Sequence, residues 1–267
     1  MSTRKMVLRF VTAASLLIAA GGSFRGARAE IVPQDQALPC RPTIACTADI
    51  VPAGTVELEA GVLRRQFPGD GAQWTAPFLI KLTVTPRLQI QIGSNGYTIS
   101  RGEHVPAQYL DDVTIGSKIH LADQTVYWPS LSISASVSVP TFQRMGYLRT
   151  YDLLLALYAT KDLGPLHIDL NAGLNLWRIE GDPLPQGFLA LATSAMVTGP
   201  LAAMVELYGF SDAAPVATRD AGVLLAAAWS MRTWLILDAG SDLALVRSTR
   251  LFSLFAGMTL IPAALWR

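Results

Sequence analysis

The segment Ser130–Ser138, which reads SLSISASVS, alternates a serine with an apolar residue at every second position. Successive side chains of a β-strand point to opposite faces, so this pattern predicts a strand with one apolar face and one polar face. Similar segments recur about twelve times along the chain, separated by turn-forming residues. We therefore predict an all-β fold, a transmembrane antiparallel up-and-down β-barrel of about 12 strands.

The connections between the predicted strands alternate in length. Tight connections such as Pro86-Arg87 and Gly199-Pro200 follow the even-numbered strands, with a longer exception at 123–128, whereas longer polar connections such as 99–109 follow the odd-numbered strands. Outer-membrane barrels have brief periplasmic turns and longer outer loops, which places the N-terminus of this barrel on the periplasmic side. The predicted strands are 55–62, 78–85, 88–93, 112–121, 130–138, 151–161, 166–176, 187–198, 201–210, 220–230, 233–244 and 251–261.

The first residues have the features of an export signal. Basic residues at positions 4, 5 and 9 precede the apolar stretch Phe10–Ala20, and Ala27-Arg28-Ala29 matches the small-x-small pattern that signal peptidase accepts. We expect residues 1–29 to be a cleaved signal peptide and the mature protein to reach the cell outer membrane. We further expect an N-terminal periplasmic segment at 30–54, a barrel at 55–262, and a C-terminal tail at 263–267 because Pro262 breaks the last strand.

The composition is consistent with a membrane barrel. Hydrophobic residues make up 51% of the chain and charged residues 15%, and the mean hydropathy is +0.35. A barrel distributes this apolarity over alternate positions that face lipid, so no single window resembles a membrane helix. The formal net charge of +1 predicts no nucleic-acid partner. The expected partners are outer-membrane lipid, the barrel-assembly machinery and a small-molecule solute.

The two cysteines, Cys40 and Cys46, lie before the first predicted strand. An exported chain meets an oxidising compartment, so a local disulfide is the favoured interpretation, with two free thiols as the alternative. A zinc site would need more ligands than this segment provides. We expect neither a metal nor another cofactor.

The polar face of the strands is where we expect any function to be located. Charged side chains on that face would either line a passage for small solutes or form a polar network that fills a blocked lumen, and the sequence leaves both open. Acidic residues outnumber lysines there, so an open lumen is expected to favour cations or neutral solutes over anions. The candidate lumen-facing residues are Glu57, Glu59, Lys81, Asp112, Lys118, His120, Asp152, Asp169, Glu206, Asp238 and Asp242.

A family resemblance is carried by four segments. They are ADIVPAGTVELEAG at 48–61, the hairpin at 77–92, LDAGSDLAL at 237–245 and FAGM at 255–258. Their order is similar to that in the outer-membrane family described as the "putative MetA-pathway of phenol degradation" transporters. The resemblance spans about residues 48–260, and it implies a β-barrel that passes small, often aromatic, molecules. Such barrels usually end on an aromatic residue, whereas here Arg267 follows Trp266.

Enzymatic activity is the less favoured alternative. A barrel enzyme that modifies lipids would need serine and histidine side chains close together at the lipid edge of the wall. The three histidines are His104, in a predicted outer loop, and His120 and His167, which are predicted to point inward. We therefore expect a transporter or channel and no catalytic residues, with a structural or surface barrel as the alternative.

Overall fold

The computed structural model describes residues 36–69, 71–101, 107–141, 151–179, 182–211, 220–246 and 252–266, all within one compact unit that spans Ile31–Arg267. The predicted signal peptide lies outside the described residues. The described strands are β1 (Thr55–Gln66), β2 (Ala72–Thr75), β3 (Phe78–Thr85), β4 (Leu88–Ser94), β5 (Tyr97–Arg101), β6 (Ala107–Leu110), β7 (Val113–Ala122), β8 (Ser130–Val139), β9 (Asp152–Leu163), β10 (Leu166–Ile179), β11 (Asp182–Thr198), β12 (Leu201–Phe210), β13 (Asp220–Arg232), β14 (Leu235–Ala244) and β15 (Phe252–Ala264).

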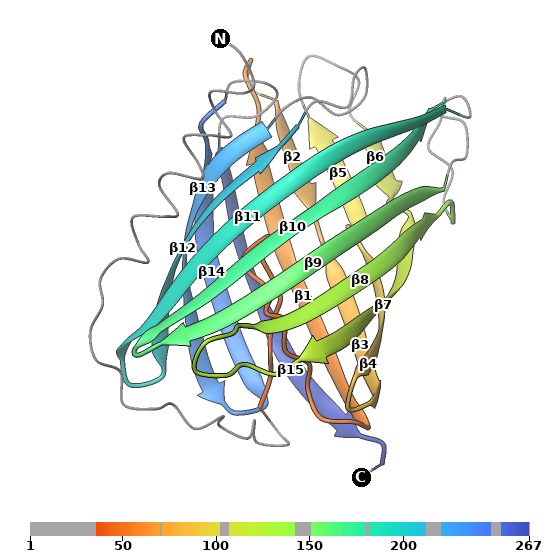
Figure 1. Cartoon of the computed structure of the whole chain (residues 1–267). Helices are drawn as coiled ribbons and strands as arrows, with labels where there is room; N and C mark the ends of the chain where they lie inside the picture. The colour runs from red at the N-terminus through yellow and green to blue at the C-terminus, as the bar shows by residue number, and fades with distance from the viewer. Residues whose placement is uncertain are drawn as a thin grey trace. The chain divides into compact units, whose positions relative to one another are not determined.

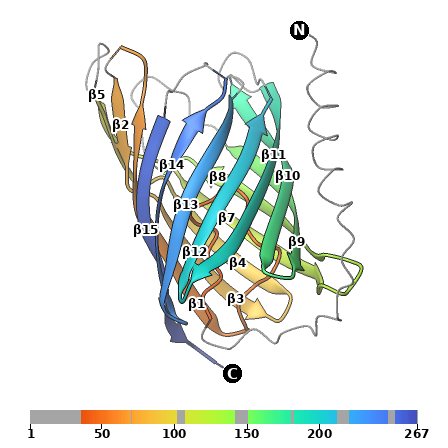
Figure 2. The same ribbon diagram turned by 90° about the vertical axis from the view of Figure 1, so that its left-hand side faces the viewer.

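The strands form one antiparallel sheet that closes on itself. Each long strand pairs with its neighbours in sequence, and β15 returns to pair with β1 over eleven residue pairs. The result is the predicted closed barrel of 12 strands. Its strands are tilted relative to the barrel axis, as Figure 1 and Figure 2 show. The pairing of β1 with β15 closes the long strands into a ring, as a sheet that spans a membrane requires, while the short strand β6 pairs with β5 alone among the described strands. In the described part of the chain, no helix is long and apolar enough to cross a membrane.

Three neighbouring strands of the barrel are interrupted at the same level. The breaks separate β2 from β3 at Ala76-Pro77, β4 from β5 at Asn95-Gly96, and β6 from β7 at Asp111-Asp112. Proline lacks the N–H that a strand ladder needs, and Gly96 has a φ of +67° that favours glycine. Hydrogen bonds from Ala76 N to Tyr97 O and from Asp111 N to Gly96 O bridge the breaks. The short strands therefore extend the wall, and parts of the predicted loop at 99–109 are strand.

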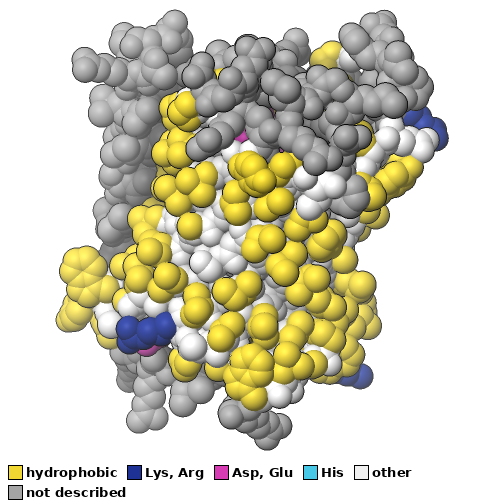
Figure 3. Space-filling view, turned by 90° about the vertical axis from the view of Figure 1, so that its right-hand side faces the viewer, with side chains coloured by type: hydrophobic (Ala, Val, Ile, Leu, Met, Phe, Trp, Pro, Cys, Tyr) yellow, Lys and Arg dark blue, Asp and Glu magenta, His cyan; other side chains and the backbone are white. Residues whose placement is uncertain are grey.

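The outward face of the wall is apolar, as the alternation predicts. Ile119 of β7, Ile133 of β8 and Leu157 of β9 are register partners on adjacent strands and are 42%, 41% and 47% exposed. Hydrophobic side chains cover much of the wall in Figure 3. The inward neighbours on the same strands, Ser132 and Thr160, are buried. This division is the expected pattern for a barrel that faces lipid outside and a polar lumen inside.

The last strand differs from the expectation that Pro262 breaks it. Strand β15 continues to Ala264, with Ala263 paired to Val56 and Ala264 paired to Thr55. The register shifts between Val56 and Leu58, so that one strand carries extra residues at this point. A bulge of this kind accommodates a residue that cannot donate a ladder hydrogen bond, and it leaves Pro262 inside the strand without breaking the sheet.

Candidate functional site

Residues 36–54 run inside the barrel, and we call them the plug. Ala37 N donates to Thr233 O in the β13–β14 connection, and Gly54 N donates to Thr83 O near the β3–β4 turn, both at 2.8 Å. Both ends of the plug therefore lie at the end of the barrel that carries these short turns. Figure 1 shows the trace between them inside the barrel, surrounded by the strands. From the sequence we expected an N-terminal periplasmic segment at 30–54, and its described part, 36–54, occupies the lumen.

Buried carboxylates of the wall accept hydrogen bonds from the plug backbone. An irregular segment has no strand partner, so its N–H groups need acceptors from side chains when water is excluded. Three of the predicted lumen-facing residues supply them from β1 and β12, and each is at most 2% exposed. Glu57 accepts from Leu38 N at 2.7 Å, Glu59 from Cys40 N at 2.8 Å and Arg41 N at 3.0 Å, and Glu206 from Ile44 N at 2.8 Å and Ala45 N at 2.5 Å.

Buried lysines of the wall donate to the plug's carbonyl groups. Lys81 Nζ donates to Leu38 O at 2.8 Å and also forms ion pairs with Glu57 and, at 2.6 Å, with Glu59. Lys118 Nζ donates to Thr47 O and, at 3.3 Å, to Asp49 O, and it lies 4.6 Å from the centre of the Tyr158 ring. The charges on these wall residues are therefore used in contacts with one another and with the plug.

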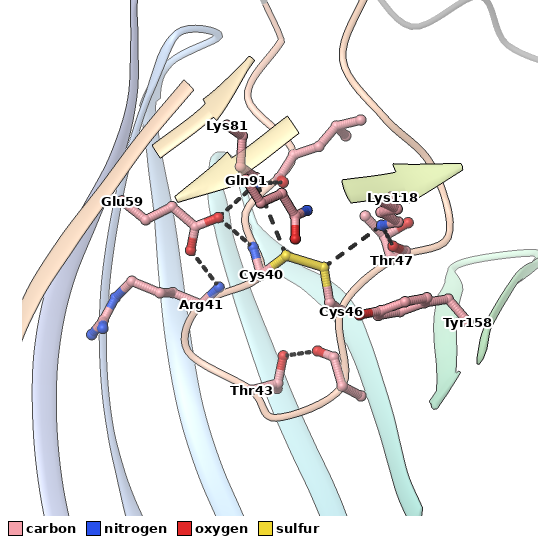
Figure 4. The surroundings of a disulfide bond; sticks show 12 residues. Cys40, Arg41, Thr43, Cys46, Thr47, Glu59, Lys81, Gln91, Lys118 and Tyr158 are labelled. Atoms are coloured by element: carbon pink, nitrogen blue, oxygen red, sulfur yellow. Dashed lines mark hydrogen bonds and ion pairs between the residues drawn. A yellow bond between two sulfur atoms is a disulfide. The ribbon is translucent and has the colours of Figure 1, made fainter. Parts of the chain in front are cut away.

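A disulfide closes residues 40–46 of the plug into a ring. Cys40 and Cys46 are bonded, as expected from the sequence, and the ring holds Thr43 at its tip (Figure 4). The two sulfur atoms lie close to the two buried lysines, with Cys40 Sγ 4.0 Å from Lys81 Nζ and Cys46 Sγ 3.8 Å from Lys118 Nζ. The disulfide therefore lies against β3 and β7, the two strands that flank β4 in the wall.

The remaining predicted residues have more varied surroundings. His120 Nε2 lies 2.9 Å from Asp123, and Asp169 lies 3.2 Å from His167 Nε2. Asp238 pairs with Arg41, and Asp242 accepts from Tyr208 Oη at 2.8 Å. Asp112 accepts from Thr141 N at 3.1 Å at the break before β7, and Asp152 is half-buried at the start of β9. His104 lies outside the described residues.

Several wall residues that contact the plug were not predicted from the sequence. Thr160 Oγ1 accepts from Ala48 N at 2.6 Å, and Ser132 donates to Ala48 O. Arg41 in the plug was also missed. Hydroxyl residues on the polar face of a strand carry no signal that separates plug contacts from solvent contacts, although an arginine beside Cys40 could have been noticed.

A cavity of about 440 Å³ lies against the plug and the wall from β12 through β15 to β1. Three plug residues, Arg41, Pro42 and Ile44, form one side of it. Polar and aromatic side chains of the wall form the rest, including Arg65, Tyr208, Phe210, Asp220, Asp242 and Phe255. The space is therefore a polar and aromatic chamber within the lumen. Among the described residues, no group of three or more His, Cys, Asp or Glu side chains could hold a metal ion.

No family model and no curated protein matches the sequence. Among solved structures, the COG4313 outer membrane channel from Pseudomonas putida F1 aligns with a TM-score of 0.58 at 14% identity, covering 80% of this chain and 97% of that one. The NanC porin aligns with a TM-score of 0.51 at 7% identity, covering 77% of this chain and 98% of that one. At these identities the similarity establishes the fold. The chain has the closed antiparallel β-barrel fold that these outer-membrane proteins share.

Proposed function

We propose that this protein is an outer-membrane channel for small solutes, and that the plug closes it in the conformation described here. The observation that carries the proposal is that the wall is complete without the plug. Strands β1 and β15 close the sheet by themselves, and the plug is held mainly by polar contacts that water could replace.

The chamber beside the plug supports a small solute with an apolar or aromatic part. Its lining combines Phe210, Phe255 and Tyr208 with the charged side chains of Arg65 and Asp242. Sites for small organic molecules commonly join apolar walls to a few polar groups. The family resemblance noted in the sequence points to the same class of solute. A structural barrel with a permanently blocked lumen is the alternative, since the plug is in place.

Planar-bilayer recordings and liposome swelling test the proposal. The informative variant replaces residues 38–50 with a Gly/Ser linker of equal length, which keeps the tether but removes the side chains and the disulfide ring. We expect small or rare conductance steps from the unmodified protein and larger, persistent ones from the variant. A folded variant that stays impermeable would establish the blocked-lumen alternative. The matched control is Arg87→Ala, a change in the exposed β3–β4 turn.

A further inference from the structure

The side chain of Arg41 leaves the plug and reaches the place where the barrel closes. Its Nη2 lies 3.3 Å from Asp238 Oδ1 on β14, and its Nε lies 3.4 Å from Asp238 Oδ2. The same Nη2 donates to Ala256 O on β15 at 3.3 Å. The guanidinium group therefore contacts two neighbouring strands at once, using the two-pronged geometry that arginine offers to a carboxylate.

The wall leaves space for this guanidinium group by means of two glycines. Gly61 of β1 pairs with Gly257 of β15, and Gly257 pairs in turn with Asp238 of β14, so the three residues lie in one row across the closing seam. A Cβ atom at either glycine would lie 2.5 Å from a guanidinium nitrogen of Arg41 and 2.7 Å from a backbone oxygen of the adjacent strand. Any larger residue in this row would displace the arginine, the strand or both.

The backbone of Arg41 is held at the same seam. Its N–H donates to Glu59 Oε2 on β1 at 3.0 Å, so Arg41 is attached to β1, β14 and β15 together. Apart from the contacts of the two lysines with the cysteine sulfur atoms, the other hydrogen bonds from wall carboxylates and lysines to the plug reach backbone groups, which any residue except proline would supply. In the described part of the plug, Arg41 is the residue whose charged side chain forms an ion pair with the wall.

We propose that Arg41 is a positioning residue that latches the plug to the closing seam of the barrel, and that the channel opens by release of Arg41 from Asp238. The conductance part of this inference rests on the proposed channel function. The Arg41 side chain is 16% exposed and lines the chamber, whereas that of Asp238 is 2% exposed. The guanidinium group can therefore exchange its carboxylate partner for water from the chamber. The disulfide between Cys40 and Cys46 keeps the ring intact as it moves.

Hydrogen exchange of the full-length protein in detergent tests the latch independently of conduction. The variants are Arg41→Ala, Asp238→Asn and the double variant, with Arg41→Lys as the conservative change and Thr43→Ala as the control within the plug. Thr43 Oγ1 donates to Ala45 O inside the ring, so its loss leaves the wall contacts intact. We expect the amides of residues 38–45 to exchange about tenfold faster in either single variant, as the loss of one charge-assisted contact allows. Arg41→Lys should fall between wild type and Arg41→Ala.

The double variant distinguishes a latch from two unrelated effects. If Arg41 and Asp238 act on each other, the plug amides of the double variant exchange no faster than those of the faster single variant. An acceleration in the double variant equal to the product of the two single accelerations would overturn the proposal. Unchanged plug exchange in Arg41→Ala would also overturn it. Heat-modifiability gels check that each barrel is folded. If Arg41→Ala does not fold, Arg41→Lys takes its place in the exchange comparison. In bilayers, Arg41→Ala should open more often than wild type. Faster plug exchange with no conductance in any variant would support the latch and count against the channel.

Discussion

Glu206 shows at the scale of one residue how the wall recognises an irregular segment. Its carboxylate is buried on β12 and accepts hydrogen bonds from two consecutive plug amides, those of Ile44 and Ala45. An ionised carboxylate offers acceptors on both oxygens and no donor, so it suits two adjacent N–H groups. Ala45 also packs against Ala190, Ala192 and Tyr208, the described apolar cluster of the interior. Glu206 thus fixes the plug where it meets apolar wall.

Replacement of Glu206 by Gln should loosen this contact selectively. The amide side chain keeps one acceptor oxygen but turns its NH₂ group toward a plug N–H, so one buried donor loses its partner. Hydrogen bonds to charged groups contribute about 1.5–3 kcal/mol. We expect the free energy that protects the Ile44 and Ala45 amides from hydrogen exchange to fall by an amount of this order. Amide exchange resolved by residue measures it. Equal acceleration at Leu38, which Glu57 holds, would show that the effect is general to the plug.

At the scale of the element, β8 separates a lipid face from a lumen face. Ile133 points outward between Ile119 and Leu157, while Ser134 shares a hydrogen bond of 2.8 Å with Tyr158 Oη in the lumen. Ser136 lies on the same inward face, paired with Gly116 and Leu154. Since the side-chain period of a strand is two, a shift of one residue would exchange the faces of the entire strand.

A matched pair of arginine substitutions tests this register. Ile133→Arg would place a charge among lipid tails and should destabilise the barrel by about 2–4 kcal/mol if that position is near the bilayer midplane. Ser136→Arg would place the same side chain toward the lumen, and we expect a much smaller loss of barrel stability. Urea titration in lipid vesicles, followed by gel mobility without boiling, measures both. Equal losses for the two variants would contradict the assigned faces.

At the scale of the whole molecule, the apolar exterior requires a bilayer or detergent. Large hydrophobic side chains such as Leu155, Leu170, Leu189 and Leu225 are at least 40% exposed on different strands, and a soluble protein rarely exposes apolar surface in such continuity. Closure by β1 and β15 makes this exterior a continuous belt.

We accordingly expect the mature chain, after removal of residues 1–29, to fractionate with the outer membrane. Extraction should require detergent, and the folded barrel should migrate faster than the boiled chain on a gel, because strands that close on themselves resist unfolding by detergent. Cell fractionation with both gel conditions checks this. Recovery of the mature chain as a soluble periplasmic monomer would contradict the membrane assignment.

The cation preference expected from the sequence remains a prediction, and the structure changes which residues could produce it. Glu57 and Glu59 are occupied by Lys81 and by plug amides. Their charges would contribute to ion preference only after the plug moves. Arg65, Asp220 and Asp242, by contrast, line the chamber as it stands.

The sequence by itself determined the strands and their faces. Alternation at period two is a local property, so SLSISASVS at 130–138 is sufficient to predict both the strand and which of its side chains meet lipid. The number of strands follows from counting such segments. The short strands β2, β5 and β6 escaped prediction because segments such as Ala72–Thr75 and Ala107–Leu110 are too short to show a period.

Only the tertiary structure decided that the plug occupies the lumen and that Arg41 reaches the closing seam. The plug contacts join residues far apart in the chain, such as Ala45 with Glu206 and Arg41 with Asp238. Most of them use backbone N–H and C=O groups, which every residue except proline carries in the same form and which therefore leave no pattern in a sequence. A carboxylate on the polar face of a strand looks the same whether it meets water, an ion or a peptide amide. Its partner is fixed only when closure of the barrel brings distant strands around one interior.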